Sequence, residues 1–209
     1  MFTGAVTPEV LAILERFMRD PQMAGFRLVG GTALALLRGH RLSADLDLFT
    51  EGSRLPPRLE WLLERSYKMS AIAIGDDRAV LTGRIEGVKT DFVAYPYRWL
   101  NAALVQEGIR LASLEDIAAM KVAAVGQRGS KKDFFDIAEL LDGFTLAQLL
   151  DGFRRKFPAA ADLHYLQALT YFADAERDPD PMSTDRTPSW MAVKARILQA
   201  VREFGDVAH

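Results

Sequence analysis

The first part of the chain alternates between short apolar segments and turn residues. Thr7-Pro8-Glu9 offers an N-cap, a proline for the first turn and an early acid, and the apolar residues that follow recur at helical spacing, which predicts a helix over about 8–19. An apolar run over 26–29 ends at Gly30-Gly31, and the helix-forming sequence TALALLR follows over 32–38. This order predicts a strand, a glycine turn and a helix.

Polar and apolar residues alternate with a period of two in the next part of the chain. Residues 45–50 alternate strictly, which predicts a strand with Asp45 and Asp47 on one face and leucines on the other. A helix is expected over 57–67. Three further β-type segments are separated by glycine-containing turns and predict an antiparallel meander over 69–74, 79–85 and 88–95.

The pattern changes after Pro96, where apolar residues recur every three to four positions. This period predicts helices over 113–125, 131–141, 146–156, about 159–173 and about 189–204. Ser113 and Thr145 begin capping-box sequences, and the turn-rich segment 178–188 is expected to form an exposed loop. We therefore expect an α/β (α+β) fold: a core over 1–110 with a mixed sheet and flanking helices, followed by a helical region over 111–209 packed on it.

The composition narrows the chemistry. The 209 residues include 49% hydrophobic residues, 26 Lys+Arg against 28 Asp+Glu, three histidines and no cysteine. These figures are typical of a globular protein and exclude thiol catalysis, cysteine zinc sites and iron–sulfur clusters. No apolar run is long enough for a bilayer and no secretory leader is recognisable, so we expect a cytoplasmic protein without membrane contact. The groups that remain as candidates for catalysis or binding are carboxylates, the Lys and Arg side chains, and hydroxyls.

Asp45 and Asp47 are unusual residues for a strand and lie on one face, close enough for their side chains to converge on one ion. If the strand over 88–95 pairs beside them, Asp91 joins the pair. Three carboxylates about 5 Å apart repel by roughly 3 kcal/mol per pair at an effective dielectric of 20. A divalent cation reverses this penalty, and oxygen ligands favour Mg²⁺ or Mn²⁺. The alternative is a half-buried strand with a solvated polar face.

Gly30-Gly31-Thr32 lies between the predicted strand and helix, where free backbone N–H groups and the helix dipole favour a phosphate. The alternative is that the glycines make the turn and Thr32 caps the helix. Neither a P-loop nor a dinucleotide-binding G-x-G-x-x-G is present.

These blocks together resemble a known family. LVGGTALALLRGHRLSADLDLF (28–49), VKTDFV (88–93) and SLEDIAAMKVAAVGQRGSKKDFFDIAELL (113–141) are similar in order and spacing to the nucleotidyltransferase superfamily typified by DNA polymerase β, and within it to the AbiEii/AbiGii-type toxin nucleotidyltransferases. The resemblance implies a polymerase-β-like fold. The remaining C-terminal helices add no motif, and the family often has a longer helical C-terminal portion.

The resemblance also implies roles for individual residues. Asp45, Asp47 and Asp91 would be the catalytic, metal-binding triad, and Asp91 would also take a proton from the acceptor hydroxyl. The implied nucleotide- and phosphate-binding residues are Gly30, Gly31, Thr32, Arg41, Ser43, Lys89, Lys121, Lys132 and Asp133.

Several of these residues have simpler interpretations. Lys121 is either a phosphate contact or a lysine that extends from an apolar helix to solvent, and Asp133 is either a site residue or the partner of Ser130 in a capping box. Asp136 is expected to pair with a lysine one turn earlier. Lys89 is either the ion partner of Asp91 or a phosphate contact.

Two larger groups are equally open. A basic wall facing the acidic site and a solvated helix surface are alternatives for Arg128, Lys131, Lys132, Arg154, Arg155 and Lys156. Base stacking and packing between sheet and helices are alternatives for Tyr95, Tyr97 and Trp99.

The resulting hypothesis is a Mg²⁺-dependent (or Mn²⁺-dependent) enzyme that moves a nucleoside monophosphate from an NTP to a hydroxyl acceptor. By resemblance the acceptor would be an RNA such as tRNA, and the protein would be a toxin with a cognate antitoxin. Two alternatives are another D-x-D metal enzyme, such as a glycosyltransferase or phosphohydrolase, and a non-catalytic module that binds nucleotide or antitoxin.

Overall fold

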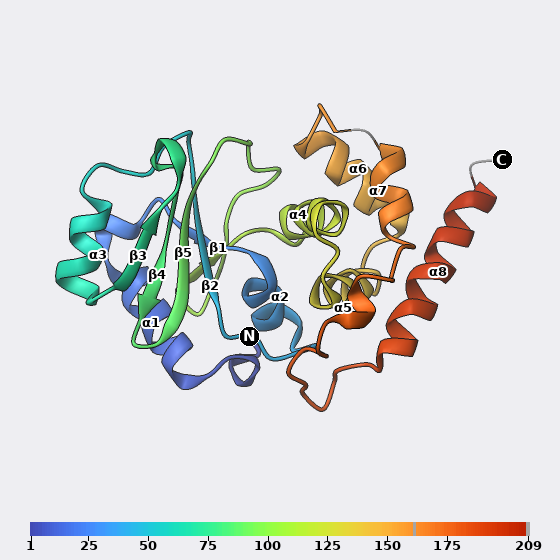
Figure 1. The fold of residues 1–209 in the computed structure, drawn as a ribbon, viewed down its shortest axis with the longest axis horizontal. Coiled ribbons are helices and arrows are strands. Elements are labelled where there is room, and N and C mark those ends of the chain that lie inside the picture. Colours follow the sequence, from blue (N-terminus) through green and yellow to red (C-terminus); the bar gives the residue numbers. More distant parts are fainter. Residues whose placement is uncertain (161, 208–209) are drawn as a thin grey trace.

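The structure is a computed structural model that describes residues 1–160 and 162–207. Its centre is a seven-stranded mixed sheet with the strand order β3-β4-β5-β2-β1-β7-β6 (Figure 1). The strands are β1 (Arg27–Leu28), β2 (Leu46–Glu51), β3 (Ser70–Ile74), β4 (Val80–Ile85), β5 (Val88–Tyr95), β6 (Leu104–Gln106) and β7 (Ile109–Leu111).

The meander β3-β4-β5 is antiparallel, as the sequence predicts. The strand β5 then pairs in parallel with β2, and this register places Asp47 directly opposite Asp91. The hairpin β6-β7 was not predicted. Its strands have three residues each, too few for a recognisable period, and β7 joins the sheet through a single parallel register pair, Leu28 with Leu111.

The helices are α1 (Pro8–Arg19), α2 (Gly30–Arg38), α3 (Leu59–Tyr67), α4 (Leu114–Gln127), α5 (Lys131–Leu140), α6 (Leu146–Lys156), α7 (Asp162–Ala168) and α8 (Trp190–Val207). Helices α1 and α3 cover one face of the sheet, and α2 lies on the other face, between the sheet and α5 (Figure 1). The helical predictions are confirmed with small shifts. The helix expected over about 159–173 is reduced to α7, and its residue 161 lies outside the described residues.

Caps explain where several helices begin. The Thr7 side chain accepts a hydrogen bond from Val10 N at the start of α1, and Thr145 forms a complete capping box with Gln148 at the start of α6. Helix α2 begins at Gly30, two residues before the predicted start, and its N-cap residue Val29 has no side-chain hydrogen bond to the helix. The interpretation of Thr32 as the helix cap is therefore wrong, because Thr32 lies inside the helix.

The hydrophobic core is continuous from the sheet into the C-terminal helices. One cluster of buried side chains contains Leu28 and Phe92 from the sheet, Leu34 from α2, and Ile117 and Phe134 from α4 and α5. Helices α4, α5, α6 and α7 form a group beside α2, and α8 lies at its outer side (Figure 1). The elements that hold the site are thus anchored in one core.

The predicted loop over 178–188 runs back across the molecule from the helical region; we call these residues the strap. Met182 O accepts a hydrogen bond from Leu42 N, and the Thr184 and Thr187 hydroxyls donate to Gly39 O and His40 O. The strap is therefore fixed to the segment that follows α2. No helix among the described residues has the length and apolar character needed to cross a bilayer.

Candidate active site

Two predicted carboxylates meet because β2 and β5 are neighbours. Asp47 and Asp91 are register partners on parallel strands, and Asp45 lies two residues before Asp47 at the entry to β2. Partial burial raises the pKa of Asp47, and the Asp91 carboxylate raises it further. Asp45 adds to the same effect. The sheet thus brings the three predicted carboxylates to one place.

Lys89 extends over this acidic cluster from the same face of β5. Its Nζ donates to Asp91 Oδ2 at 2.8 Å, and this hydrogen bond raises the lysine pKa, with further attraction from all three carboxylates. The other oxygen of Asp91, Oδ1, is buried without a hydrogen-bond partner. The ion-pair interpretation of Lys89 is confirmed.

An oxygen-only donor set with an orphaned buried carboxylate oxygen fits a divalent cation such as Mg²⁺ or Mn²⁺. Asp45, Asp47 and Asp91 are the residues that would hold it. In their present positions, no three His, Asp or Glu side chains of the described residues already form a cation-sized group. Cation binding would therefore require these side chains to rearrange. The contact that would change is the ion pair between Lys89 and Asp91.

The glycine turn lies directly against these carboxylates. Gly30 has φ of +70°, and a Cβ atom there would lie 2.6 Å from Asp47 Oδ2. A Cβ atom on Gly31 would overlap the Arg41 guanidinium. Glycine is required at both positions because the backbone passes so close to charged groups. The first N–H groups of α2 lack a side-chain cap and lie next to the cluster, as a phosphate site requires.

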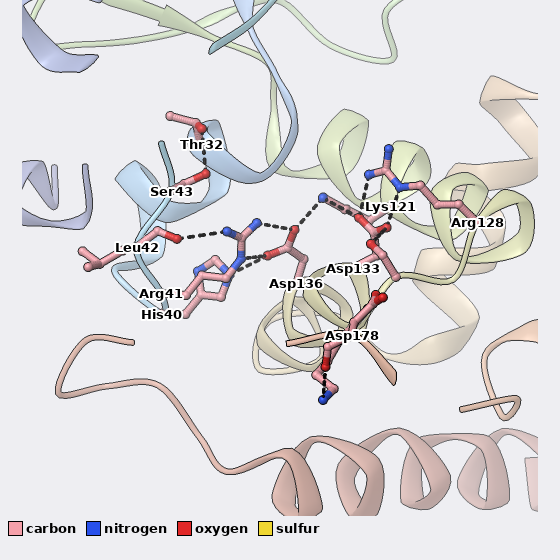
Figure 2. Close-up of polar contacts among 12 residues, drawn as sticks. Thr32, His40, Arg41, Leu42, Ser43, Lys121, Arg128, Asp133, Asp136 and Asp178 are labelled. Carbon is pink, nitrogen blue, oxygen red and sulfur yellow. Dashed lines mark hydrogen bonds and ion pairs between the residues drawn. The ribbon is translucent and has the colours of Figure 1, made fainter. Parts of the chain in front are cut away.

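Two hydroxyls connect α2 to the D-x-D segment. Thr32 Oγ1 donates a short hydrogen bond to Asp45 O and shares a 2.8 Å hydrogen bond with Ser43 Oγ. Both side chains are buried (Figure 2). Thr32 and Ser43 therefore fix the carboxylates relative to the glycine turn.

A buried ion network lies beside Gly31. It is centred on Asp136 of α5 (Figure 2). The Asp136 carboxylate accepts hydrogen bonds from Arg41 Nε at 2.7 Å and Nη2 at 3.0 Å, and from His40 Nε2 at 2.7 Å. Lys121 Nζ lies 2.5 Å from Asp136 Oδ2. Burial raises the pKa of Asp136, but the nearby Lys121 and Arg41 outweigh it, so the pKa lies well below the ordinary aspartate value.

Asp133 extends the same network. Its carboxylate accepts from Lys121 Nζ at 3.0 Å, from Ser130 Oγ at 2.7 Å, and from the Arg128 guanidinium at 2.8 and 3.0 Å. The side chain is fully buried, and despite burial its pKa is lowered by Lys121 and Arg128. Ser130 and Asp133 do not form a capping box, because the Ser130 side chain accepts no hydrogen bond from the backbone of α5. The Ser130 hydroxyl donates to the Asp133 carboxylate instead.

Two other sequence interpretations are also wrong. Lys121 does not extend to solvent: it is 4% exposed and placed between two carboxylates. Asp136 does not pair with a lysine one turn earlier on its own helix, since its partners come from α4 and from the segment after α2.

The N-terminus of α5 is capped by a residue that is distant in sequence. Asp178 Oδ2 in the strap accepts from Lys131 N at 2.9 Å, and Asp178 O accepts from Lys131 Nζ at 2.6 Å. Lys131 also pairs with Asp180 at 3.1 Å. The strap thereby fixes the first turn of α5, which carries Asp133.

A pocket of about 500 Å³ joins these parts. Its lining includes Asp45 and Asp47, the glycine turn, Lys121, Arg128 and the exposed Lys132. The other lining residues are Thr32, Arg41, Leu42, Ser43, Ala44, Ser130, Asp178, Pro179, Asp180, Pro181 and Met182. Asp91, Lys89 and Asp133 lie beside the pocket but do not line it.

Most of the predicted basic wall does not face the site. Only Arg128 and Lys132 line the pocket, while Lys131 binds the strap and Lys156 is buried against Asp116 at 2.7 Å. Arg155 pairs with Asp151 on its own helix.

The packing interpretation of the aromatic residues is confirmed. Tyr95 packs against Tyr97 and Trp99 with ring centroids 5.3 and 5.2 Å apart, and Tyr97 packs against Phe157. These rings join the sheet to α6 and line no part of the pocket.

Sequence reasoning missed His40 and the strap residues Asp178 and Asp180, and it misplaced Asp136. Asp133 and Asp136 lie three residues apart on the buried face of α5, and two acids at that spacing in an otherwise apolar stripe are a signal for a buried network. For the strap no local signal exists, because its partners are distant in sequence.

Comparisons with known proteins give a family match over most of the chain. The model of a family described as "Nucleotidyl transferase AbiEii toxin, Type IV TA system" matches residues 12–208. A protein of Aquifex aeolicus (strain VF5), described as "Uncharacterized protein aq_aa25", is 32% identical over 185 residues, which cover 86% of this chain and 87% of that protein.

Two solved structures have the same fold. The structure of JHP933 from Helicobacter pylori matches with a TM-score of 0.55 and 17% identity, covering 98% of this chain and 97% of that one. A second H. pylori structure, of a candidate nucleotidyltransferase, matches with a TM-score of 0.52 and 19% identity over 97% and 99% of the two chains. The expected polymerase-β-like mixed α/β fold is confirmed.

Proposed function

Because the chain belongs to the AbiEii family of nucleotidyltransferase toxins, we propose that its pocket transfers a nucleoside monophosphate from an NTP to a hydroxyl acceptor with the help of Mg²⁺ or Mn²⁺. The observation that supports this most directly is the register of β2 and β5, which sets Asp47 against Asp91 beside the Gly30 turn. The carboxylates proposed to be catalytic are thus adjacent to the backbone N–H groups proposed to bind phosphate.

In the proposed reaction the acceptor oxygen bonds to the α-phosphorus, the bond from that phosphorus to the bridging oxygen breaks, and pyrophosphate leaves. Asp91 Oδ1 has no hydrogen-bond partner, and we propose that it takes the proton of the acceptor hydroxyl once the side chains of the cluster have rearranged. Asp45, Asp47 and Asp91 would hold the divalent cation, which when bound offsets negative charge on the phosphates. The N–H groups at Gly30 and Gly31 would bind and orient the triphosphate.

The cations of the pocket divide into two groups. Lys132 is exposed, has no ion-pair partner among the described residues, and is proposed to bind phosphate directly. Lys121 and Arg41 line the pocket but are held by Asp136 and Asp133, so their proposed contact with phosphate comes from atoms already fixed in place. Such preorganised charge does not need to reorganise during reaction.

The acceptor and partner are further parts of this proposal. We propose an RNA acceptor such as tRNA, a cognate antitoxin, and action in the cytoplasm, where NTPs and RNA are available. The words "TA system" in the family description support the antitoxin. We also propose a boundary close to the predicted one at residue 110, directly after β7, because β7 is the last strand of the described residues and α4 follows at Leu114.

The test is label transfer. The protein is incubated with total RNA, Mg²⁺ and each NTP in turn, labelled on the α- or the γ-phosphate. We expect α-label on RNA and γ-label in pyrophosphate, and loss of both in D47N. The control variant D142N removes an exposed carboxylate in the turn after α5, outside the pocket lining, and should keep full activity.

Two results would contradict the proposal. Binding of NTP without α-label transfer to any RNA or protein acceptor would favour the non-catalytic module. Release of γ-label as inorganic phosphate, or turnover of sugar nucleotides, would favour the other D-x-D enzymes.

A further inference from the structure

Lys89 is the one residue of the acidic cluster for which the proposed reaction assigns no step. It lies two residues before Asp91 on β5, so both side chains are on the same face of the sheet. Its ammonium group binds Asp91 Oδ2 at 2.8 Å and is attracted by Asp45 and Asp47 as well. The lysine side chain is 45% exposed, whereas that of Asp91 is 19% exposed. A half-exposed cation therefore covers a carboxylate that is itself largely enclosed.

We propose that Lys89 is a built-in counter-cation that competes with the divalent cation for Asp91 and so weakens the affinity of the site for metal. The proposal rests on the proposed function, because it takes Asp91 as a metal ligand. It gives Lys89 a role in setting cation affinity, separate from phosphate binding.

The Lys89 ammonium and a cation bound at Asp91 would occupy the same small region. Asp91 Oδ2 accepts a hydrogen bond from the ammonium group at 2.8 Å and is therefore not free to coordinate a cation, whereas Oδ1 has no partner. An ammonium left in that place would also repel the incoming ion strongly, because both charges would lie within a few ångströms in a partly buried site. Lys89 must therefore move away when metal binds, and its exposed, flexible four-carbon chain permits this.

The neighbouring strand offers no replacement for Lys89. Its register partner on β4 is Arg84, and the register partner of Asp91 is Thr82. The Arg84 guanidinium donates to Gly87 O at 2.7 Å, at the tip of the hairpin. Without Lys89, the three carboxylates would face one another with no adjacent cation from either β4 or β5.

This arrangement has two consequences in the absence of metal. The ammonium reduces repulsion among the carboxylates, so the metal-free protein is more stable with Lys89 than without it. The same contact must be broken before metal binds, so the apparent metal affinity is lower with Lys89 than without it. An ordinary surface ion pair would produce neither effect at the metal site.

The experiment is a Mn²⁺ titration of the metal-free chain, followed by electron paramagnetic resonance of free Mn²⁺, without NTP or RNA. The variants are K89M, which removes the charge and keeps the length, and K89R, which keeps the charge. R84M is the matched control, since it removes one positive charge from the adjacent strand. We expect K89M to bind Mn²⁺ about tenfold more tightly, as expected for loss of one close unit charge. K89R and R84M should stay within about twofold of the unmodified chain.

Thermal melts supply a second measurement. In EDTA, K89M should melt at a lower temperature than R84M, and the rise on adding Mg²⁺ should be larger for K89M than for any other variant. If K89M is too unstable to purify, the same comparison is made with K89Q.

The outcomes separate this inference from the proposed function. If the unmodified chain binds Mn²⁺, D91N loses that binding, and K89M binds no more tightly, then Lys89 does not compete and only the inference fails. If neither the unmodified chain nor K89M binds Mn²⁺, the metal site and the inference fail together. Tighter binding by R84M to the same degree as by K89M would also overturn the inference, since net charge would then explain the change.

Discussion

The buried network around Asp136 leads to a quantitative prediction for D136N. Asparagine has nearly the same shape as aspartate, but it removes the negative charge and turns a hydrogen-bond acceptor into a donor. Three cations, Arg41, Lys121 and Arg128, now face two carboxylates, and after the substitution they face only Asp133. Arg41 keeps at most one of its two hydrogen bonds to residue 136, and it has no other ion pair among the described residues.

The magnitude follows from the burial of the network. Asp136 is completely buried, and removal of one partner from a buried ion pair costs about 3–5 kcal/mol. We expect about 3 kcal/mol, the low end of that range, because Lys121 keeps Asp133 and the Arg41 Nη1 atom keeps its hydrogen bond to Leu42 O. For a chain of this size that loss lowers the melting temperature by about 6–12 °C.

The assay is urea unfolding and thermal melting in EDTA without nucleotide, so that neither metal nor ligand contributes. D142N is the matched control, because Asp142 pairs with Arg196 at the surface and an exposed pair contributes about 0–1 kcal/mol. A free energy of unfolding for D136N within about 1 kcal/mol of that for D142N would show that the network has little energetic weight.

The pH dependence gives an independent check on the same residue. The pKa of Asp136 is depressed in the folded state, so its contribution to stability is complete above the pKa of the unfolded chain, about 4, and is lost as pH falls toward the lower folded-state pKa. The difference between the unmodified chain and D136N should therefore be constant from pH 5 to 7 and should shrink below pH 4. A difference that grows at acid pH would contradict the depressed pKa.

Three further substitutions test other parts of the site. D47A should abolish nucleotide transfer yet leave the melting temperature in EDTA unchanged or higher, because it removes a carboxylate that repels Asp91; a large drop would mean that the aspartate is structural. G31A should lower the free energy of unfolding by about 1–3 kcal/mol and weaken NTP binding, because its methyl group overlaps the Arg41 guanidinium, and unchanged melting and binding would exclude that overlap. D178A should lower the free energy of unfolding by about 1 kcal/mol, as for loss of a helix N-cap, and a melting temperature equal to that of the unmodified chain would show that the strap does not stabilise α5.

Local patterning accounts for most of the elements. The period of two identified β2 and the meander, and the period near 3.6 identified α1 and the helices after residue 113, because both periods depend only on which face of an element is buried. The hairpin β6-β7 and the early start of α2 were not predicted. Strands of three residues contain too little periodicity, and a helix that begins at a glycine with positive φ lacks the usual cap signal.

The candidate site also has a part that the sequence predicted and a part that it did not. The pairing of the D-x-D segment with Asp91 was predicted as a condition on strand order, and the register of β2 and β5 fulfils it. The partners of Asp136 were not predicted, because Arg41 is 95 residues away in sequence and reaches it only after α2 and α5 have packed together.

Sequence patterning therefore settles which residues can carry the chemistry and which face of each element they occupy, because side-chain type and spacing are local properties. Tertiary packing decides whether each charged side chain is paired with an opposite charge or left exposed. Lys121 and Lys132 are both lysines on predicted helices, yet one is enclosed between two carboxylates and the other is exposed at the pocket. The difference arises because desolvation and distant partners, which no local pattern contains, determine the electrostatics of a buried site.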